Sequence, residues 1–160
     1  MRLRQICFVS NDLENALSSF SFITGSDVCF RDEGVSYFGL KNGLLEVDGN
    51  FLEVVSPFKP NTTAERFLTR MNGDAGYMLI FECEDADTYR KKAVDLKIRD
   101  IWSSDLNNGV KATHYHPKDI GGLIISVDSM NNINWKNKDS YWQWSGDSWR
   151  SNKNNICSIK

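Results

Sequence analysis

The sequence predicts an α+β fold in which two βαβββ modules form a curved mixed sheet around a cleft, followed by a tryptophan-rich C-terminal tail. Three observations predict this fold: two similar strands that each end in an acidic turn, a helical pattern after each strand, and a glycine turn before the last strand of each half. With 160 residues, the chain is long enough for one compact domain or for two small modules that share a core.

The two halves begin alike. QICFVSNDL, residues 5–13, matches MLIFECEDA, residues 78–86, with Ile6 aligned to Leu79. Both segments continue into apolar residues at helical spacing, so each half is predicted to start with a strand and a helix. The apolar residues are Leu13, Ala16, Leu17 and Phe20, before Gly25, in the first half and Ala86, Tyr89, Ala93 and Leu96 in the second.

The two halves also end alike. VDGNFLEVVS, residues 47–56, aligns with DIGGLIISVD, residues 119–128, when Gly49 is matched to Gly121. This alignment has an offset of 72 (121 minus 49), against 73 (78 minus 5) for the first pair of segments. The remaining strands are predicted at residues 28–31, 35–40 and 43–47 in the first half and at 99–102 and 109–116 in the second.

The chain therefore divides into a first module at residues 1–56, a linker at 57–75, a second module at 76–128 and an extension at 129–160. The linker holds two prolines and several polar residues, which predict a loop with a short helix from Thr63.

The extension is too aromatic for a free linker. We expect it to pack across the domain, against a dimer partner or over one end of the cleft, and its last seven residues, NNICSIK, to add a strand. It holds four of the five tryptophans: Trp135, Trp142, Trp144 and Trp149.

The alternation of side chains along a strand assigns cleft-facing residues. In the first strand Gln5 and Cys7 are predicted to face the cleft, and in its repeat Met78 and Ile80 take the same place. The second half of the cleft is thus mainly apolar, which suits an acyl or aromatic ligand surface.

Composition narrows the class of protein. The net charge of −2 gives no indication of a nucleic-acid or membrane partner, and no apolar run is long enough to span a bilayer. The four cysteines form no CxxC pair, which argues against zinc ribbons and redox motifs and favours a reducing, cytoplasmic location. The start of the chain, MRLRQICFVSND, is predicted to be a strand and not a signal peptide. We expect a small-molecule ligand and a homodimer.

The repeat, with QICFVSNDL, GNFLEVV, MLIFECED and HPKDIGG, resembles the vicinal oxygen chelate superfamily across residues 2–128. That superfamily includes glyoxalase I, extradiol dioxygenases, methylmalonyl-CoA epimerases and bleomycin-resistance proteins. The segment HPKDIGG is similar to the one before the last strand of methylmalonyl-CoA epimerases.

The resemblance implies four metal-ligand positions, which fall on Gln5, Glu53, Met78 and Ile125. Glu53 is a good oxygen ligand and Gln5 a weak neutral one, whereas methionine suits a hard divalent ion poorly and isoleucine cannot coordinate. We therefore expect a degenerate metal site and no cofactor.

The segment THYHPKDIGG, residues 113–122, holds both histidines of the chain. If His114 and His116 face the cleft, Glu53 could complete a set of two histidines and one carboxylate for a metal. They could equally make polar contacts to a ligand without any metal, or lie on the surface with local hydrogen bonds. Lys118 either contacts an anionic group, such as a coenzyme A phosphate, or is a solvated lysine in a turn.

Glu53 is the candidate catalytic residue. A lone carboxylate in an apolar cleft has a raised pKa and can act as a general base next to a carbonyl group. Alternatively, Glu53 pairs with Arg2, Arg4 or another cation and is structural.

Three functions follow from these observations. The first is a glyoxalase- or epimerase-like protein that acts on or binds a small carbonyl or acyl-CoA compound, with Gln5, Cys7, Met78, Ile80, His114, His116, Lys118 and Ile125 in contact with the ligand. The second is a metal-free protein that sequesters a ligand, as bleomycin-resistance proteins do. The third is an interaction domain that uses the tryptophan-rich extension.

Overall fold

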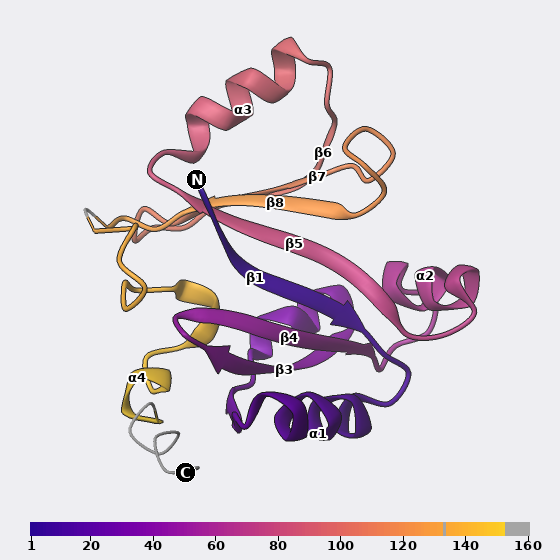
Figure 1. Cartoon of the computed structure of the whole chain (residues 1–160). Coiled ribbons are helices and arrows are strands. Elements are labelled where there is room, and N and C mark those ends of the chain that lie inside the picture. Colours follow the sequence, from indigo (N-terminus) through magenta and orange to yellow (C-terminus); the bar gives the residue numbers. More distant parts are fainter. Residues whose placement is uncertain (133, 153–160) are drawn as a thin grey trace.

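The computed structural model describes residues 1–132 and 134–152. NNICSIK, predicted to add a strand, lies outside these residues. Within them, a single eight-stranded mixed sheet runs in the order β2-β3-β4-β1-β5-β8-β7-β6. The sheet is curved, and on its outer face α1 packs against β3 and β4 while α3 packs against β7 and β8 (Figure 1). None of the described helices has the length and apolar character needed to cross a membrane.

Each half of the sheet is a βαβββ module, as predicted. The first consists of β1 (Arg2–Val9), α1 (Leu13–Thr24), β2 (Val28–Phe30), η1 (Glu33–Phe38), β3 (Leu40–Val47) and β4 (Asn50–Pro57). The second consists of β5 (Ala75–Cys83), α3 (Ala86–Asp95), β6 (Asp100–Asp105), β7 (Lys111–Tyr115) and β8 (Ile124–Ser129). Between them lies α2 (Thr63–Met71), and η2 (Gln143–Ser145) and α4 (Trp149–Asn152) follow the sheet.

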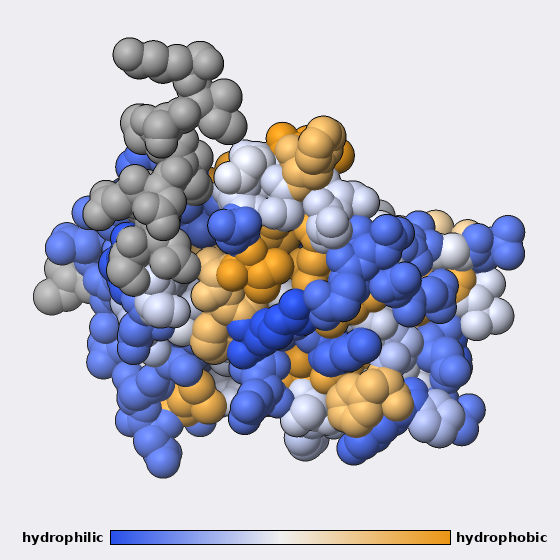
Figure 2. All heavy atoms as spheres, turned by 90° about the horizontal axis from the view of Figure 1, so that it is seen from below, coloured by the Kyte–Doolittle hydropathy of each residue, from blue (hydrophilic) through white to orange (hydrophobic). Residues whose placement is uncertain are grey.

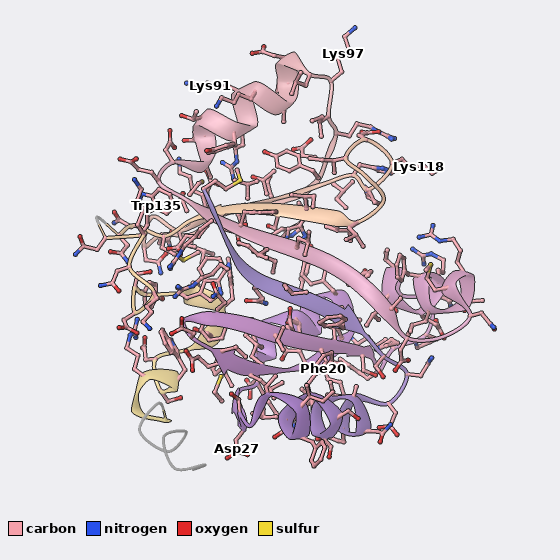
Figure 3. All side chains as sticks on the ribbon, in the orientation of Figure 1. Phe20, Asp27, Lys91, Lys97, Lys118 and Trp135 are labelled. Carbon is pink, nitrogen blue, oxygen red and sulfur yellow. The ribbon has the colours of Figure 1, made fainter. Side chains whose placement is uncertain are left out.

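The predicted helix after the first strand begins and ends where the sequence indicates. The Asp12 side chain accepts a hydrogen bond from the Asn15 N–H at 3.2 Å and caps α1. Gly25 ends it with a φ of 70°, which glycine adopts without steric cost. Phe20 points from α1 toward the sheet, where its ring lies 4.7 Å from that of Phe8 (Figure 3).

One predicted strand is wrong. Residues 35–40 belong mostly to the 3-10 helix η1, because the flanking residues are capping residues. Asp32 accepts a hydrogen bond from the Gly34 N–H at 2.8 Å, and Gly39 closes the helix with a φ of 73°. Phe38, at the end of η1, contacts Trp102 on β6, with ring centroids 5.5 Å apart. The 3-10 helix of the first module thus contacts the edge strand of the second module.

The strand register corrects the sequence alignment of the last strands. Cys7 pairs with Glu53 between β1 and β4, and Ile80 pairs with Ser126 between β5 and β8. The offset is therefore 73 for both (80 minus 7 and 126 minus 53), and Ser126, not Ile125, corresponds to Glu53. The two consecutive glycines at 121–122 allowed either alignment, and a slip of one residue reverses the face of a strand.

The concave face of the sheet is covered by residues 134–150, which form the C-terminal segment. Trp142 and Trp149 have 0% of their surface exposed and belong to the same apolar cluster as Phe51, Met78 and Ile80. In Figure 1 this segment runs from the end of β8 back along the first half of the sheet to α4. The hollow that the sheet encloses is therefore filled by the chain itself.

Arg4 on β1 holds the C-terminal segment against the sheet. Its buried guanidinium donates hydrogen bonds to the backbone carbonyls of Lys138 at 3.1 Å and Ser140 at 2.7 Å. It lies 3.7 Å from the Glu82 carboxylate, which Arg2 contacts at 2.8 Å. Burial and then the Arg2 charge lower the pKa of Arg4 to about 10, so Arg4 is still protonated at neutral pH.

A second contact involves a buried carboxylate on β8. Asp128 accepts hydrogen bonds from the Trp144 indole N–H at 2.7 Å and from the Ser126 hydroxyl at 2.5 Å. Burial raises the pKa of Asp128 to about 7, because neither donor carries a charge that offsets the lost hydration.

We predict that Arg4→Met lowers the free energy of unfolding by about 3 kcal/mol, because it leaves buried carbonyls and part of the Glu82 charge without a partner. The matched control is Arg31→Met, which removes an ion pair with Glu14 whose side chains are 48% and 67% exposed. This control is expected to change stability by less than about 1 kcal/mol in urea denaturation. Equal effects of both substitutions would show that Arg4 does not anchor the segment.

We also predict that Asp128→Asn stabilises the protein by roughly 2 kcal/mol at pH 8 and has little effect at pH 5. An aspartate has a pKa of about 3.9 in the unfolded chain, so the folded chain, with a pKa of about 7, binds an extra proton between these values. The resulting stability is complete below about pH 4 and is lost as the pH rises through about 7. The asparagine fits because the Ser126 hydroxyl can turn to donate to the Thr113 carbonyl.

Chemical denaturation of both proteins across this pH range measures the effect. A destabilisation that is the same at pH 5 and pH 8 would mean that the charge of Asp128 is not the cause.

Candidate functional site

Glu53 lies on β4 at the concave face, with 5% of its surface exposed. Its carboxylate accepts one hydrogen bond from the Gln5 amide at 2.8 Å and another from the Asn42 amide at 2.6 Å. Within the described residues it forms no ion pair, since Arg2 and Arg4 both contact Glu82. The alternative in which Glu53 pairs with either arginine is therefore wrong.

Both amides that bind Glu53 have a fixed orientation. The Gln5 oxygen accepts a hydrogen bond from the Trp142 indole N–H at 2.9 Å. The Asn42 oxygen accepts one from the backbone N–H of Asp32 at 2.8 Å. Because each oxygen is held by a donor, each amide nitrogen must point at Glu53. The site thus supplies donors alone to the carboxylate, as a base in its ionised form requires.

The protonation of Glu53 reflects two opposing effects. Burial raises the pKa of Glu53, and the contacts with Asn42, Cys7 and Gln5 lower it, but the net direction is upward. The Asp32 charge raises it further. Cys7 pairs with Glu53 between β1 and β4, and burial raises the pKa of its thiol well above the usual value. The thiol therefore keeps its proton at neutral pH and faces the carboxylate as a neutral group.

The structure does not assemble the four metal ligands that the resemblance implies. Gln5, Glu53 and Met78 lie at the concave face, but Ile125 packs on the opposite face, in the cluster beneath α3. The prediction that Ile125 faces the hollow and contacts a ligand there is therefore wrong, because its side chain lies on the other face of the sheet. Its neighbour Ile124 packs against the concave cluster instead.

The donor set at the concave face does not fit a metal. Among the described residues, no group of three or more histidine, cysteine, aspartate or glutamate side chains could hold an ion. The Gln5 oxygen is taken by Trp142, and the Ser126 hydroxyl donates to Asp128. Methionine at 78 is a poor ligand for a hard cation.

His114 lies on the concave face of the second half, because it pairs with Ser126 between β7 and β8. Its ring is 4.4 Å from the Trp102 ring and 6.3 Å from the Phe38 ring, between centroids. Burial lowers the pKa of His114 to about 4, so the imidazole is neutral at pH 7. Three strands separate β7 from β4 in the sheet, which places His114 across the hollow from Glu53.

His116 belongs to the turn after β7. Its Nδ1 accepts a hydrogen bond from the backbone N–H of Lys118 at 3.1 Å and lies 3.4 Å from the Arg99 guanidinium. Arg99 also pairs with Asp119 at 2.8 Å. The local hydrogen-bond alternative therefore describes His116, and the metal set with His114 and Glu53 does not form. Lys118 is exposed on the connection between β7 and β8 (Figure 3).

Two open pockets lie beside the first module. One of about 400 Å³ is lined by α1, η1 and β3 and reaches Asn42 and Asp32, two members of the Glu53 network. The other, of about 430 Å³, lies between α1 and β2. Neither is lined by Glu53 or Gln5. The face seen from below Figure 1, nearest α1, mixes apolar with polar side chains (Figure 2).

Sequence reasoning missed four residues of the site: Asn42, Ser126, Asp128 and Trp142. An offset of 73 for the last strand would have placed Ser126 and Asp128 on the concave face, because these two residues lie on the face of β8 opposite to Ile125. Asn42 and Trp142 carry no local pattern that marks them. Trp142 meets Gln5 across 137 positions of sequence, so their contact depends on the complete fold.

Comparison with protein-family models gives no match, and neither does comparison with curated proteins. Solved structures do match. A variant of the Streptomyces coelicolor methylmalonyl-CoA epimerase, in complex with 2-nitronate-propionyl-CoA, has a TM-score of 0.71 and 18% identity, over 82% of this chain and 98% of that chain. The methylmalonyl-CoA epimerase from Mycobacterium tuberculosis has a TM-score of 0.69 and 19% identity, over 81% and 87%.

A hypothetical protein from Bacillus halodurans C-125 gives a TM-score of 0.70 at 12% identity, over 81% of this chain and 94% of that chain. At such identities a structural match shows the fold. The two βαβββ modules, the curved mixed sheet and these matches agree: the chain has the same fold as the methylmalonyl-CoA epimerases, as the resemblance in its sequence predicted.

Proposed function

We propose that the protein is an epimerase-like acid–base protein that works without a metal and binds a small carbonyl or acyl-CoA compound at Glu53. The observation that carries this proposal is a buried carboxylate whose hydrogen-bond partners are neutral donors. Glu82, in contrast, has the two cations Arg2 and Arg4 beside it.

The class of ligand follows from the walls of the hollow. Met78, Ile80 and Ile124 present apolar side chains beside the carboxylate, which suits an acyl chain. A carbonyl or thioester compound combines such a chain with an acidic proton on the carbon next to the carbonyl group. The solved epimerases in complex with 2-nitronate-propionyl-CoA and with methylmalonyl-CoA support this class of ligand.

The chemistry requires one proton and no other reactant. Glu53 in its ionised form takes the proton from the carbon next to the carbonyl, the electron pair moves to the carbonyl oxygen, and the proton then returns to carbon. Gln5 and Asn42 hold the carboxylate in place through its two oxygens. Because the pKa of Glu53 is raised, the rate should increase with pH through a value above that of an ordinary carboxyl group.

The alternative is a protein that sequesters its ligand without chemistry. The apolar second half of the concave face favours it, because Met78 and Ile80 stand where an acid or base would be needed opposite Gln5 and Cys7. The two functions differ in one measurable respect, namely whether the carbon next to the carbonyl exchanges its proton.

We predict that the protein catalyses exchange of the C2 proton of methylmalonyl-CoA with deuterium from D2O. Mass spectrometry measures this exchange as an increase in the mass of the thioester. Glu53→Gln should reduce this exchange by about 10²- to 10⁴-fold, because the base is lost while the shape of the side chain is kept. The control is Glu46→Gln on β3, which alters another buried glutamate whose carboxylate accepts the Gly49 N–H at 2.5 Å. It should leave exchange unchanged.

Binding is measured in parallel by thermal shift with the same thioester. A higher melting temperature with no exchange that depends on Glu53 would favour the sequestering protein. If the thioester neither raises the melting temperature nor exchanges its C2 proton, both functions are contradicted for this class of ligand.

We also predict that a ligand that reaches Glu53 changes tryptophan fluorescence. Trp142 and Trp149 are fully buried in the hollow, and Trp142 occupies the oxygen of Gln5, so such a ligand must displace them. Their emission should move to longer wavelength as they meet water, and Trp142→Phe should reduce this change. Saturable binding with no change in emission would place the ligand outside the hollow.

A further inference from the structure

Two indole N–H groups of the C-terminal segment reach the concave face, and they reach different halves of the sheet. Trp142 donates to Gln5 on β1, and Trp144 donates to Asp128 on β8. The first contact is continuous with Glu53, because the same Gln5 amide donates to that carboxylate. The second ends at Asp128 and Ser126.

The Gln5 amide has two possible orientations. An amide group accepts at its oxygen and donates at its nitrogen, so a donor at the oxygen decides where the nitrogen points. The Trp142 indole N–H is that donor. Without it, the side chain is free to turn about its last bond and to remove its nitrogen from Glu53. Asn42 has no such freedom, because a backbone N–H fixes its oxygen.

Two adjacent residues of β1, Arg4 and Gln5, fix the position of Trp142 next to the Glu53 site. Arg4 binds the backbone of the C-terminal segment at Lys138 and Ser140, and Gln5 receives the indole of Trp142. The Arg4 guanidinium also lies 5.5 Å from the centroid of the Trp142 ring. The position of the indole is therefore set by the strand whose glutamine it orients.

We propose that Trp142 is a positioning residue of the Glu53 site: its indole N–H holds the Gln5 amide in the orientation that keeps Glu53 a hydrogen-bond acceptor, ready to take a proton. The inference rests on the proposed function for the role of Glu53 as a base. The orientation itself is a property of the chain without ligand. The Trp142 indole N–H thus occupies the position in which a ligand could donate to the Gln5 oxygen. A ligand that displaces Trp142 must offer Gln5 an N–H or O–H group of its own, so that the Gln5 amide nitrogen still donates to Glu53.

The experiment is a titration of the Glu53 side-chain carboxyl carbon by NMR in the full chain without ligand, with Glu53→Gln used to assign the resonance. Trp142→Phe keeps an aromatic ring and removes the donor. It should raise the pKa of Glu53, lowering the acid dissociation constant about tenfold, since one hydrogen bond to the charged form is lost. Gln5→Leu should have at least the same effect.

The matched control is Trp144→Phe, which removes the other indole donor of the same segment. It should leave the titration of Glu53 unchanged and raise the pKa of Asp128. The titratable groups that act on Glu53 are the Cys7 thiol from β1 and the Asp32 carboxyl from the residues before η1, and all of these variants keep both.

The direction of the change separates positioning from a merely structural role. A variant that loosens the segment admits water to Glu53, which lowers its pKa toward the usual value. A lower or unchanged pKa in Trp142→Phe would therefore overturn the proposal, as would an equal rise in Trp144→Phe. No substrate is involved, so a failure of methylmalonyl-CoA exchange would refute the proposed function and leave this result standing.

Discussion

The concave face of the sheet must be shielded from water, and the rest of the structure depends on how this is done. The curvature of eight strands brings Leu44, Phe51, Met78 and Ile80 to one surface, which is too apolar to remain hydrated. The C-terminal segment covers it with two fully buried tryptophans. Covering the face also encloses the polar groups on it, and each of these then needs a hydrogen-bond partner inside the protein.

The partners are almost all neutral, and this sets the electrostatics of the site. Glu53 is held by two amides and Asp128 by an indole and a hydroxyl, so burial raises the pKa of both. Burial also raises the pKa of Glu82, but the two arginines beside it lower that pKa in part. One sheet thus contains a carboxylate, Glu82, that anchors a segment through its arginines, and two others, Glu53 and Asp128, whose hydrogen-bond donors are neutral.

The sequence predicted what depends on local pattern. The repeat predicted both βαβββ modules, and alternation along the strands placed Gln5, Cys7, Met78 and Ile80 on the concave face. There Cys7, Met78 and Ile80 pack in the same apolar cluster as Trp142, and Gln5 accepts a hydrogen bond from that tryptophan. The alignment failed where two glycines stand together, and Ile125 was assigned to the wrong face. The contact of Trp142 with Gln5 could not be predicted, because nothing local in a polar, aromatic segment says which distant amide it meets.

The pseudo-symmetry of the fold explains why one segment serves both halves. Glu53 and Ser126 occupy equivalent places in the two modules, and Ser126 leads to the carboxylate of Asp128 two residues on. Each module therefore has a buried carboxylate, Glu53 in the first and Asp128 in the second. Trp142 and Trp144 are also two residues apart, so one stretch of chain can present an indole N–H to each module. Burial raises the pKa of both carboxylates, to about 7 for Asp128, because a neutral donor compensates a buried charge less fully than a cation does.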